Sequence, residues 1–212
     1  MAVTVDDLLR AFFPNGPLAR FPALARDPAH WEVGTGFNDP TTFEAIKEQA
    51  VAAGVDMADY TEEDWLDVGG KVTILDAFGL TYFDMEMTGM VPGGFYTAWL
   101  VRKPGSPRGG PADLNLGRGW EGEPGQEKGY NGIVADEHGN AKLGVLLTSS
   151  FQDANGQEYQ GLDKWDEIHI AFHSDNIGHG FSPGPNHWTQ TVFRVRDEEK
   201  EDNGDDGNNG DD

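Results

Sequence analysis

The stretch Leu80–Arg102, LTYFDMEMTGMVPGGFYTAWLVR, decides the fold that we expect for this chain. Its first half alternates between two sets of side chains, with the period of two that is typical of a half-buried strand. Its second half, from Phe95 onward, is largely apolar on both faces, which favours a central strand. Between them, Pro92-Gly93-Gly94 combines a fixed φ with residues that tolerate positive φ. The stretch therefore predicts a β-hairpin.

Further strands are expected on both sides of this stretch. Lys71–Phe78 leads into it through Gly79, and the turn Asp136–Asn140 precedes another apolar run. Asp166–His173 and Trp188–Arg196 are expected to be the last two strands. Short strands joined by Gly and Asn turns predict a mainly β chain, folded as an antiparallel β-sandwich of jelly-roll or Ig-like type.

The N-terminal part is expected to be helical or irregular. Capping patterns at Thr4 and Thr61, and an apolar stripe that follows Pro40, predict three short helices. The proline-rich segment between the first two is expected to run irregularly over the surface. We therefore predict an extension over residues 1–68, a sandwich domain over 69–196 and a disordered acidic tail over 197–212.

Charge excludes several classes of partner. The chain has 212 residues, with 37 acidic and 15 basic side chains and a net charge of -22. Such a surface repels phosphate backbones and anionic lipids, so we expect no nucleic-acid partner and no membrane insertion. The beginning, MAVTVDDLLR, is acidic where a signal peptide is basic, so we expect no export signal. Because the chain contains no cysteine, disulfides and thiolate metal sites are excluded.

The acidity also suggests an environment. The tail 197–212 holds nine acidic residues and one lysine, so most of the excess charge lies in the rest of the chain. Acidic, lysine-poor domains resemble the proteins of halophilic organisms, whose carboxylates hold water and cations when salt screens their repulsion. An ordinary acidic interaction protein is the alternative.

Histidines form the most prominent cluster of potential ligands. Four of the six lie within nineteen residues: His169, His173, His179 and His187. On a strand, the first two share a face but lie about 13 Å apart, too far to bind one ion. We therefore consider a zinc or copper site made of His173, His179 and His187, with Asp175 as a fourth ligand. Solvent-facing and turn histidines without a metal are the alternative.

The histidines are followed by Asp175-Asn176 and by Gly184-Pro185-Asn186-His187. In these two segments alone the chain resembles a loop of the copper-zinc superoxide dismutases, in which strand histidines precede a Gly-Asp-Asn turn and a Gly-Pro-His segment. The chain lacks the cysteine of that family and ends before its remaining ligands could follow.

Two features are compatible with a carbohydrate ligand, although two carboxylates on one strand face are also expected by chance in a chain this acidic. Asp84 and Glu86 share a strand face about 7 Å apart, within the range of the carboxylate pairs of inverting glycosidases. Residues 103–132 contain nine glycines and four prolines, a composition typical of a functional or disordered loop. Trp120 and Tyr130 in this loop could contact a ligand, or could anchor the loop to its own domain.

Four segments follow one another within residues 70–195: GMVPGGFYTAWLV, ADEHGNAKLGVLL, DEIHIAFHSDN and TQTVF. In their order and spacing they resemble uncharacterised β-sandwich domains of secreted and cell-surface proteins from halophiles and cyanobacteria. The chain departs from that pattern at His173-Ser174-Asp175 and in the expected absence of an export signal. The resemblance implies a fold and no established activity.

From the sequence we expect a non-enzymatic structural or binding protein of a high-salt organism. It would act by self-assembly as a homo-oligomer, either as a virion structural subunit or as a cell-surface module, and we expect no cofactor. The first alternative is a protein that binds zinc or copper through the histidine cluster, with a redox or electron-transfer role. The second is a sandwich that binds or hydrolyses carbohydrate.

Overall fold

The computed structural model describes residues 18–25, 42–77, 79–116, 132–149, 151–152, 156–179 and 184–195. The predicted first helix, Trp120, Tyr130 and the acidic tail 197–212 lie outside these ranges. Among the described helices, none combines the length and the apolar character that a membrane span requires.

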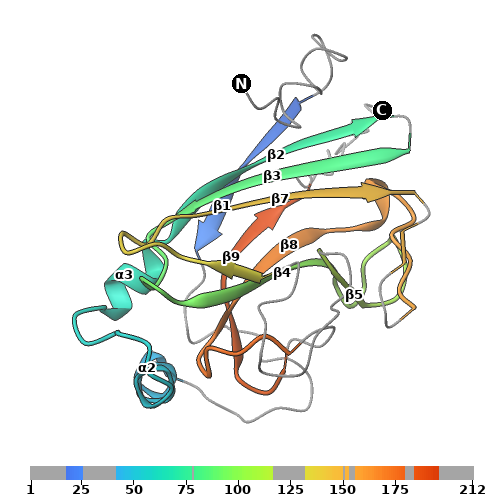
Figure 1. The fold of residues 1–212 in the computed structure, drawn as a ribbon. Helices are drawn as coiled ribbons and strands as arrows, with labels where there is room; N and C mark the ends of the chain where they lie inside the picture. The colour runs from blue at the N-terminus through green and yellow to red at the C-terminus, as the bar shows by residue number, and fades with distance from the viewer. Residues whose placement is uncertain are drawn as a thin grey trace, which may run out of the picture.

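Two antiparallel sheets form a β-sandwich, which confirms the predicted fold class (Figure 1). One sheet contains the strands β1 (Leu18–Ala25), β2 (Gly69–Ala77), β3 (Leu80–Thr88) and β7 (Ala141–Thr148). The other contains β4 (Phe95–Arg102), β5 (Ala112–Asn115), β6 (Gly132–Val134), β8 (Glu167–His173) and β9 (His187–Arg194). A short 3-10 helix, Leu162–Lys164, precedes β8.

Strand β1 lies in the segment that we expected to be irregular, so that expectation is wrong. Its first five residues pair with β2, and its last three pair with β9 in the other sheet. The change of partner falls between Pro22 and Ala23. Proline has no backbone N–H to donate to a neighbouring strand, so it is tolerated where the pairing changes. Because β1 changes its partner at this proline, it lacks the continuous alternation of apolar and polar residues that would have predicted a strand. The proposed boundary at residue 69 stays a prediction.

The predicted hairpin between β3 and β4 is also wrong, although both strands exist. β3 pairs with β2 and β7, whereas β4 pairs with β5, β6 and β8 in the other sheet. Met90 and Val91 in the connection are buried, so the chain carries apolar side chains across the end of the sandwich between the layers. The β6–β7 connection crosses beside it, and the backbone amide of Met90 donates to the carbonyl of Gly139 at 3.0 Å.

The two N-terminal helices contribute to the core of the sandwich. α2 (Phe43–Ala52) is capped by Thr42, and α3 (Glu62–Leu66) begins with the predicted capping box at Thr61. Trp65 of α3 is fully buried, with edge contacts to Phe43 of α2 at 6.0 Å and to Phe172 of β8 at 5.5 Å between ring centroids.

Candidate metal site

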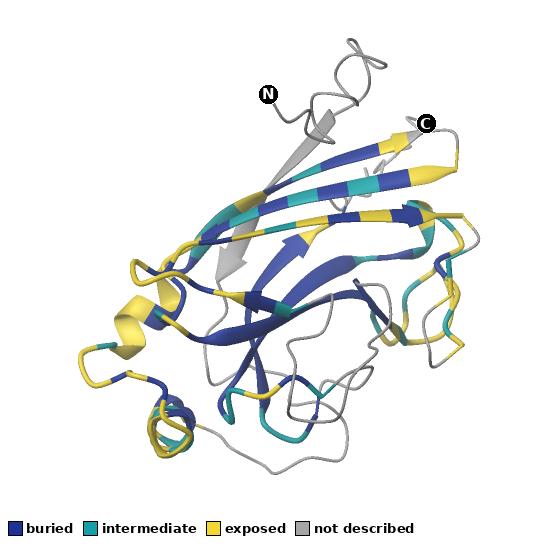
Figure 2. Cartoon of the chain, in the orientation of Figure 1, coloured by how far each residue is buried: buried dark blue, intermediate teal, exposed yellow. Residues whose placement is uncertain are grey.

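The candidate site lies where β8 ends and β9 begins. These strands are buried on both faces, as the continuous dark blue of β8 and β9 in Figure 2 shows. His173 is the last residue of β8 and His187 the first of β9, and the two face each other in the strand register. The sheet therefore fixes both backbones at the base of the connecting turn.

The turn after β8 places Asp175 beside this base. The backbone amide of Ser174 donates to the carbonyl of Asn186 at 3.0 Å, which extends the β8–β9 pairing by one step. Asn176 has a φ of 55°, a left-handed conformation that asparagine tolerates. Oδ1 of Asp175 accepts from the amide of Ile177 at 3.2 Å, so its carboxylate is held at the turn.

Three of the four predicted ligands come together. His173, Asp175 and His179 each offer one ligand atom, and these atoms lie within 4.8 Å of one another. Two ligand atoms of one tetrahedral zinc ion lie about 3.3–3.6 Å apart at bond lengths of 2.0–2.2 Å, so an inward side-chain movement of about 1 Å would complete the site. Within the described ranges, no other three His, Cys, Asp or Glu side chains gather in this way.

In this arrangement His179 and Asp175 interact directly. Nε2 of His179 lies 2.7 Å from Oδ2 of Asp175, and the side-chain amide of Asn186 donates to the same oxygen at 3.3 Å. A metal ion would replace the hydrogen bond between the imidazole and the carboxylate.

The two ring nitrogens of His173 differ in their hydrogen bonding. Nε2 shares a hydrogen bond of 2.8 Å with the hydroxyl of Thr97, whereas Nδ1 is buried and has no partner among the described residues. Oδ1 of Asn176, in the same turn, is likewise buried without a partner there. An unsatisfied buried polar atom costs about 1–3 kcal/mol, so such atoms call for an explanation. A ligand bound in the turn would supply one.

His173 is kept in the protonation state that a metal requires. Burial, followed by the nearby His187 and His179, lowers its pKa from 6.5 to about 3. The imidazole is therefore neutral at any ordinary pH, and metal binding need not displace a second proton from it.

His187 stands beside the group of three. Its ring centroid lies 6.5 Å from that of His173, and its Nδ1 lies 2.6 Å from the carbonyl oxygen of Gly184. Burial lowers its pKa. The structure thus places His187 next to the cluster but outside the 4.8 Å group.

Gly184 is a site residue that the sequence analysis named only as part of the Gly184–His187 segment, without a role of its own. Its φ is +74°, and a Cβ built on it would overlap the imidazole of His179, with Nε2 only 2.8 Å away. The ring of His179 therefore occupies the space that any other residue at position 184 would need. The Gly-Pro-Asn sequence before His187 is the signal that could have indicated this turn.

His169 lies elsewhere on the same strand, as its spacing predicted. Its Nε2 lies 2.9 Å from Oε2 of Glu167, and Lys103 forms an ion pair with the same glutamate at 3.2 Å. Burial alone would raise the pKa of Glu167, but His169 and Lys103 outweigh it and lower that pKa to about 2.

The geometry does not favour the predicted carboxylate pair as a catalytic site. Glu86 forms ion pairs with Lys142 at 2.8 Å and with Lys71. The two lysines lower the pKa of Glu86 to about 2, and Lys142 has the larger effect. A glycosidase general acid needs a raised pKa, which is the opposite shift. Asp84 lies half-buried on the same strand.

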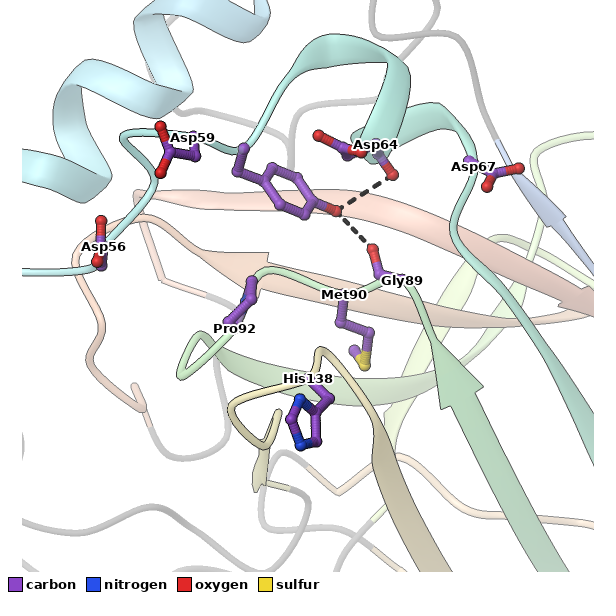
Figure 3. A pocket seen from close by; sticks show the side chains of 9 residues that line it. Asp56, Asp59, Asp64, Asp67, Gly89, Met90, Pro92 and His138 are labelled. Atoms are coloured by element: carbon purple, nitrogen blue, oxygen red, sulfur yellow. Dashed lines mark hydrogen bonds between the residues drawn. The ribbon is translucent and has the colours of Figure 1, made fainter.

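A separate acidic cavity lies between the segment that contains α3 and the β3–β4 and β6–β7 connections (Figure 3). Its volume is about 430 Å³. The hydroxyl of Tyr60 in its wall donates to the carbonyl of Gly89 at 2.6 Å and lies 3.3 Å from the carbonyl oxygen of Asp64. No three of its carboxylate and imidazole groups meet within 4.8 Å, so it does not form a comparable metal site among the described residues. Its lining is Asp56, Asp59, Tyr60, Asp64, Asp67, Gly89, Met90, Pro92 and His138.

Comparisons with known proteins assign no family. No protein-family model matches the chain, and no curated protein is significantly similar to it. Among solved structures, a Cu/Zn superoxide dismutase from Brucella abortus is similar with a TM-score of 0.36 and 12% sequence identity, over 85% of this chain and 100% of that one. A similarity this distant assigns neither a metal nor a reaction to this chain.

Proposed function

We propose that this protein binds one divalent transition-metal ion, of the zinc or copper class, through His173, Asp175 and His179. The observation that carries the proposal is the convergence of three ligand atoms within 4.8 Å at the end of β8 and the turn after it, where Nδ1 of His173 is buried and has no partner among the described residues. It supports the metal-binding alternative over the expectation of a purely structural protein.

The donor set favours particular metals. Two imidazoles and one carboxylate suit zinc and copper, whereas calcium and magnesium prefer sites made entirely of oxygen. Divalent copper binds nitrogen and oxygen donors more tightly than zinc, so we expect the higher affinity for copper. Three protein ligands leave a fourth position for water or for a small exogenous ligand, as in zinc sites that are not purely structural.

Removing one ligand should separate specific from nonspecific binding. We expect the metal-free protein to bind one zinc ion per chain, and His179→Ala to lower the affinity by at least about 100-fold, more than the loss typical of an outer-shell partner. Isothermal titration calorimetry with zinc measures the number of ions bound per chain and the affinity. His138→Ala is the matched control, because His138 lies in another turn with 75% of its side chain exposed.

A protein with a net charge of -22 also attracts cations nonspecifically, and the control variant accounts for that background. If wild type, His138→Ala and His179→Ala all bound zinc alike, the proposal would be wrong. The expectations of self-assembly, of a virion or cell surface and of a high-salt environment stay predictions, because contacts within one chain do not test them.

A further inference from the structure

The hydroxyl of Thr97 connects the candidate site to the interior of its sheet. Thr97 and Trp99 belong to β4, which pairs with β8 beside His173. Oγ1 of Thr97 lies 2.8 Å from Nε2 of His173 and accepts a hydrogen bond of 2.7 Å from the indole Nε1 of Trp99. The relative exposures of His173, Thr97 and Trp99 are 0%, 3% and 4%, so water has little access to these bonds.

The indole of Trp99, the hydroxyl of Thr97 and the imidazole of His173 can form only two arrangements of hydrogen bonds. An indole N–H can only donate, so one lone pair of the Thr97 hydroxyl is always engaged by Trp99. The hydroxyl can then either accept from Nε2–H of His173 or donate to an unprotonated Nε2. In the first case Nδ1 carries a free lone pair. In the second case Nδ1 carries a proton and cannot bind a metal.

The ring of Phe95, also on β4, packs beside the imidazole of His173 and limits its rotation. The two ring centroids lie 5.3 Å apart, and the ring planes are tilted by 51°. Thr97 is β-branched, and its χ1 is restricted on a strand, so its hydroxyl has a defined direction. Histidines that ligate metals usually donate their other ring N–H to such a fixed acceptor, which sets the tautomer.

We infer that Thr97, held by Trp99, is a positioning residue of the metal site: it accepts from Nε2–H of His173 and thereby leaves Nδ1 as the nitrogen that binds the metal. The inference rests on the proposed function of the turn. It adds a residue 76 positions away in the sequence, which touches the metal only through the imidazole.

The tautomer of His173 can be measured without any metal. Nitrogen-15 NMR of labelled, zinc-free wild-type protein should show His173 protonated at Nε2 and unprotonated at Nδ1. A proton on Nδ1 in this spectrum would overturn the inference. Because the measurement uses the wild-type protein, it does not depend on whether a variant folds.

Variants at position 97 then test the effect on affinity. Thr97→Val removes the hydroxyl at nearly constant shape and should weaken zinc binding about 10–100-fold, the loss typical of an outer-shell partner. Thr97→Ser keeps the hydroxyl and should restore binding. Thr189→Val is the matched control, because Thr189 is similarly buried on β9 but its Oγ1 faces His169 at 3.5 Å.

The outcomes separate the two proposals. If wild type binds zinc at this site and Thr97→Val binds equally well, the inference is wrong and the proposed function stands. If wild type binds no zinc at all, the proposed function fails, and the assignment of Nδ1 as the metal-binding nitrogen fails with it.

Discussion

Replacing Gly184 by alanine should abolish zinc binding at the turn and leave the sandwich folded. A Cβ at this position would overlap the ring of His179, and a side chain yields more readily than a backbone. His179 would therefore rotate out of the group that it forms with His173 and Asp175. We expect a loss of zinc affinity of at least about 100-fold, comparable with removal of the histidine itself.

Gly93→Ala is the control for backbone strain. Gly93 has a similar φ of +69°, but a Cβ there would have nothing within 4 Å. Both variants should lose about 1–2 kcal/mol of stability from the left-handed conformation, and only Gly184→Ala should lose zinc. Calorimetric titration and urea unfolding of both variants measure the two effects. If Gly184→Ala bound zinc as well as Gly93→Ala, His179 would not be a ligand.

Replacing Trp65 by alanine should lower the free energy of unfolding by about 3–5 kcal/mol, the range for a fully buried aromatic side chain. Trp65 is fully buried and packs edge-on against Phe43 and Phe172, so it joins both helices to the sandwich. The variant would therefore loosen α2 and α3 together with the sheet beneath them.

Leu66→Ala, in the same helix, is the control, because Leu66 is 37% exposed and should lose much less stability. Urea unfolding followed by circular dichroism measures both variants. If Trp65→Ala cost less than about 1 kcal/mol, the helices would be a separable extension, as the sequence alone suggested, and not part of the core.

The strands could be predicted because alternating apolar and polar side chains indicate a half-buried strand, but the pairing of the strands could not. The runs that became β3 and β4 have the expected pattern, yet the same pattern fits a hairpin and a crossing between two sheets. The pairing of β4 with β8 and the burial of Met90 and Val91 distinguish the two, and the β6–β7 turn beside Met90 is distant in the sequence. β1 was missed because it divides its pairing between two sheets at Pro22.

The candidate site was predictable to the extent that its residues are close in sequence. The grouping of His173, Asp175 and His179 follows from one strand end and the turn after it. Thr97 lies on a strand whose pairing with β8 no local pattern reveals. Gly184 was missed for a different reason, because its importance depends on where the ring of His179 lies.

The most direct measurement of the central claim is a crystal structure of the zinc-loaded protein, with anomalous diffraction recorded on both sides of the zinc absorption edge. We predict an anomalous peak in the β8–β9 turn, with His173, Asp175 and His179 as ligands at 2.0–2.2 Å. Zinc found instead among the aspartates of the acidic cavity, or no ordered zinc at the turn, would contradict the account.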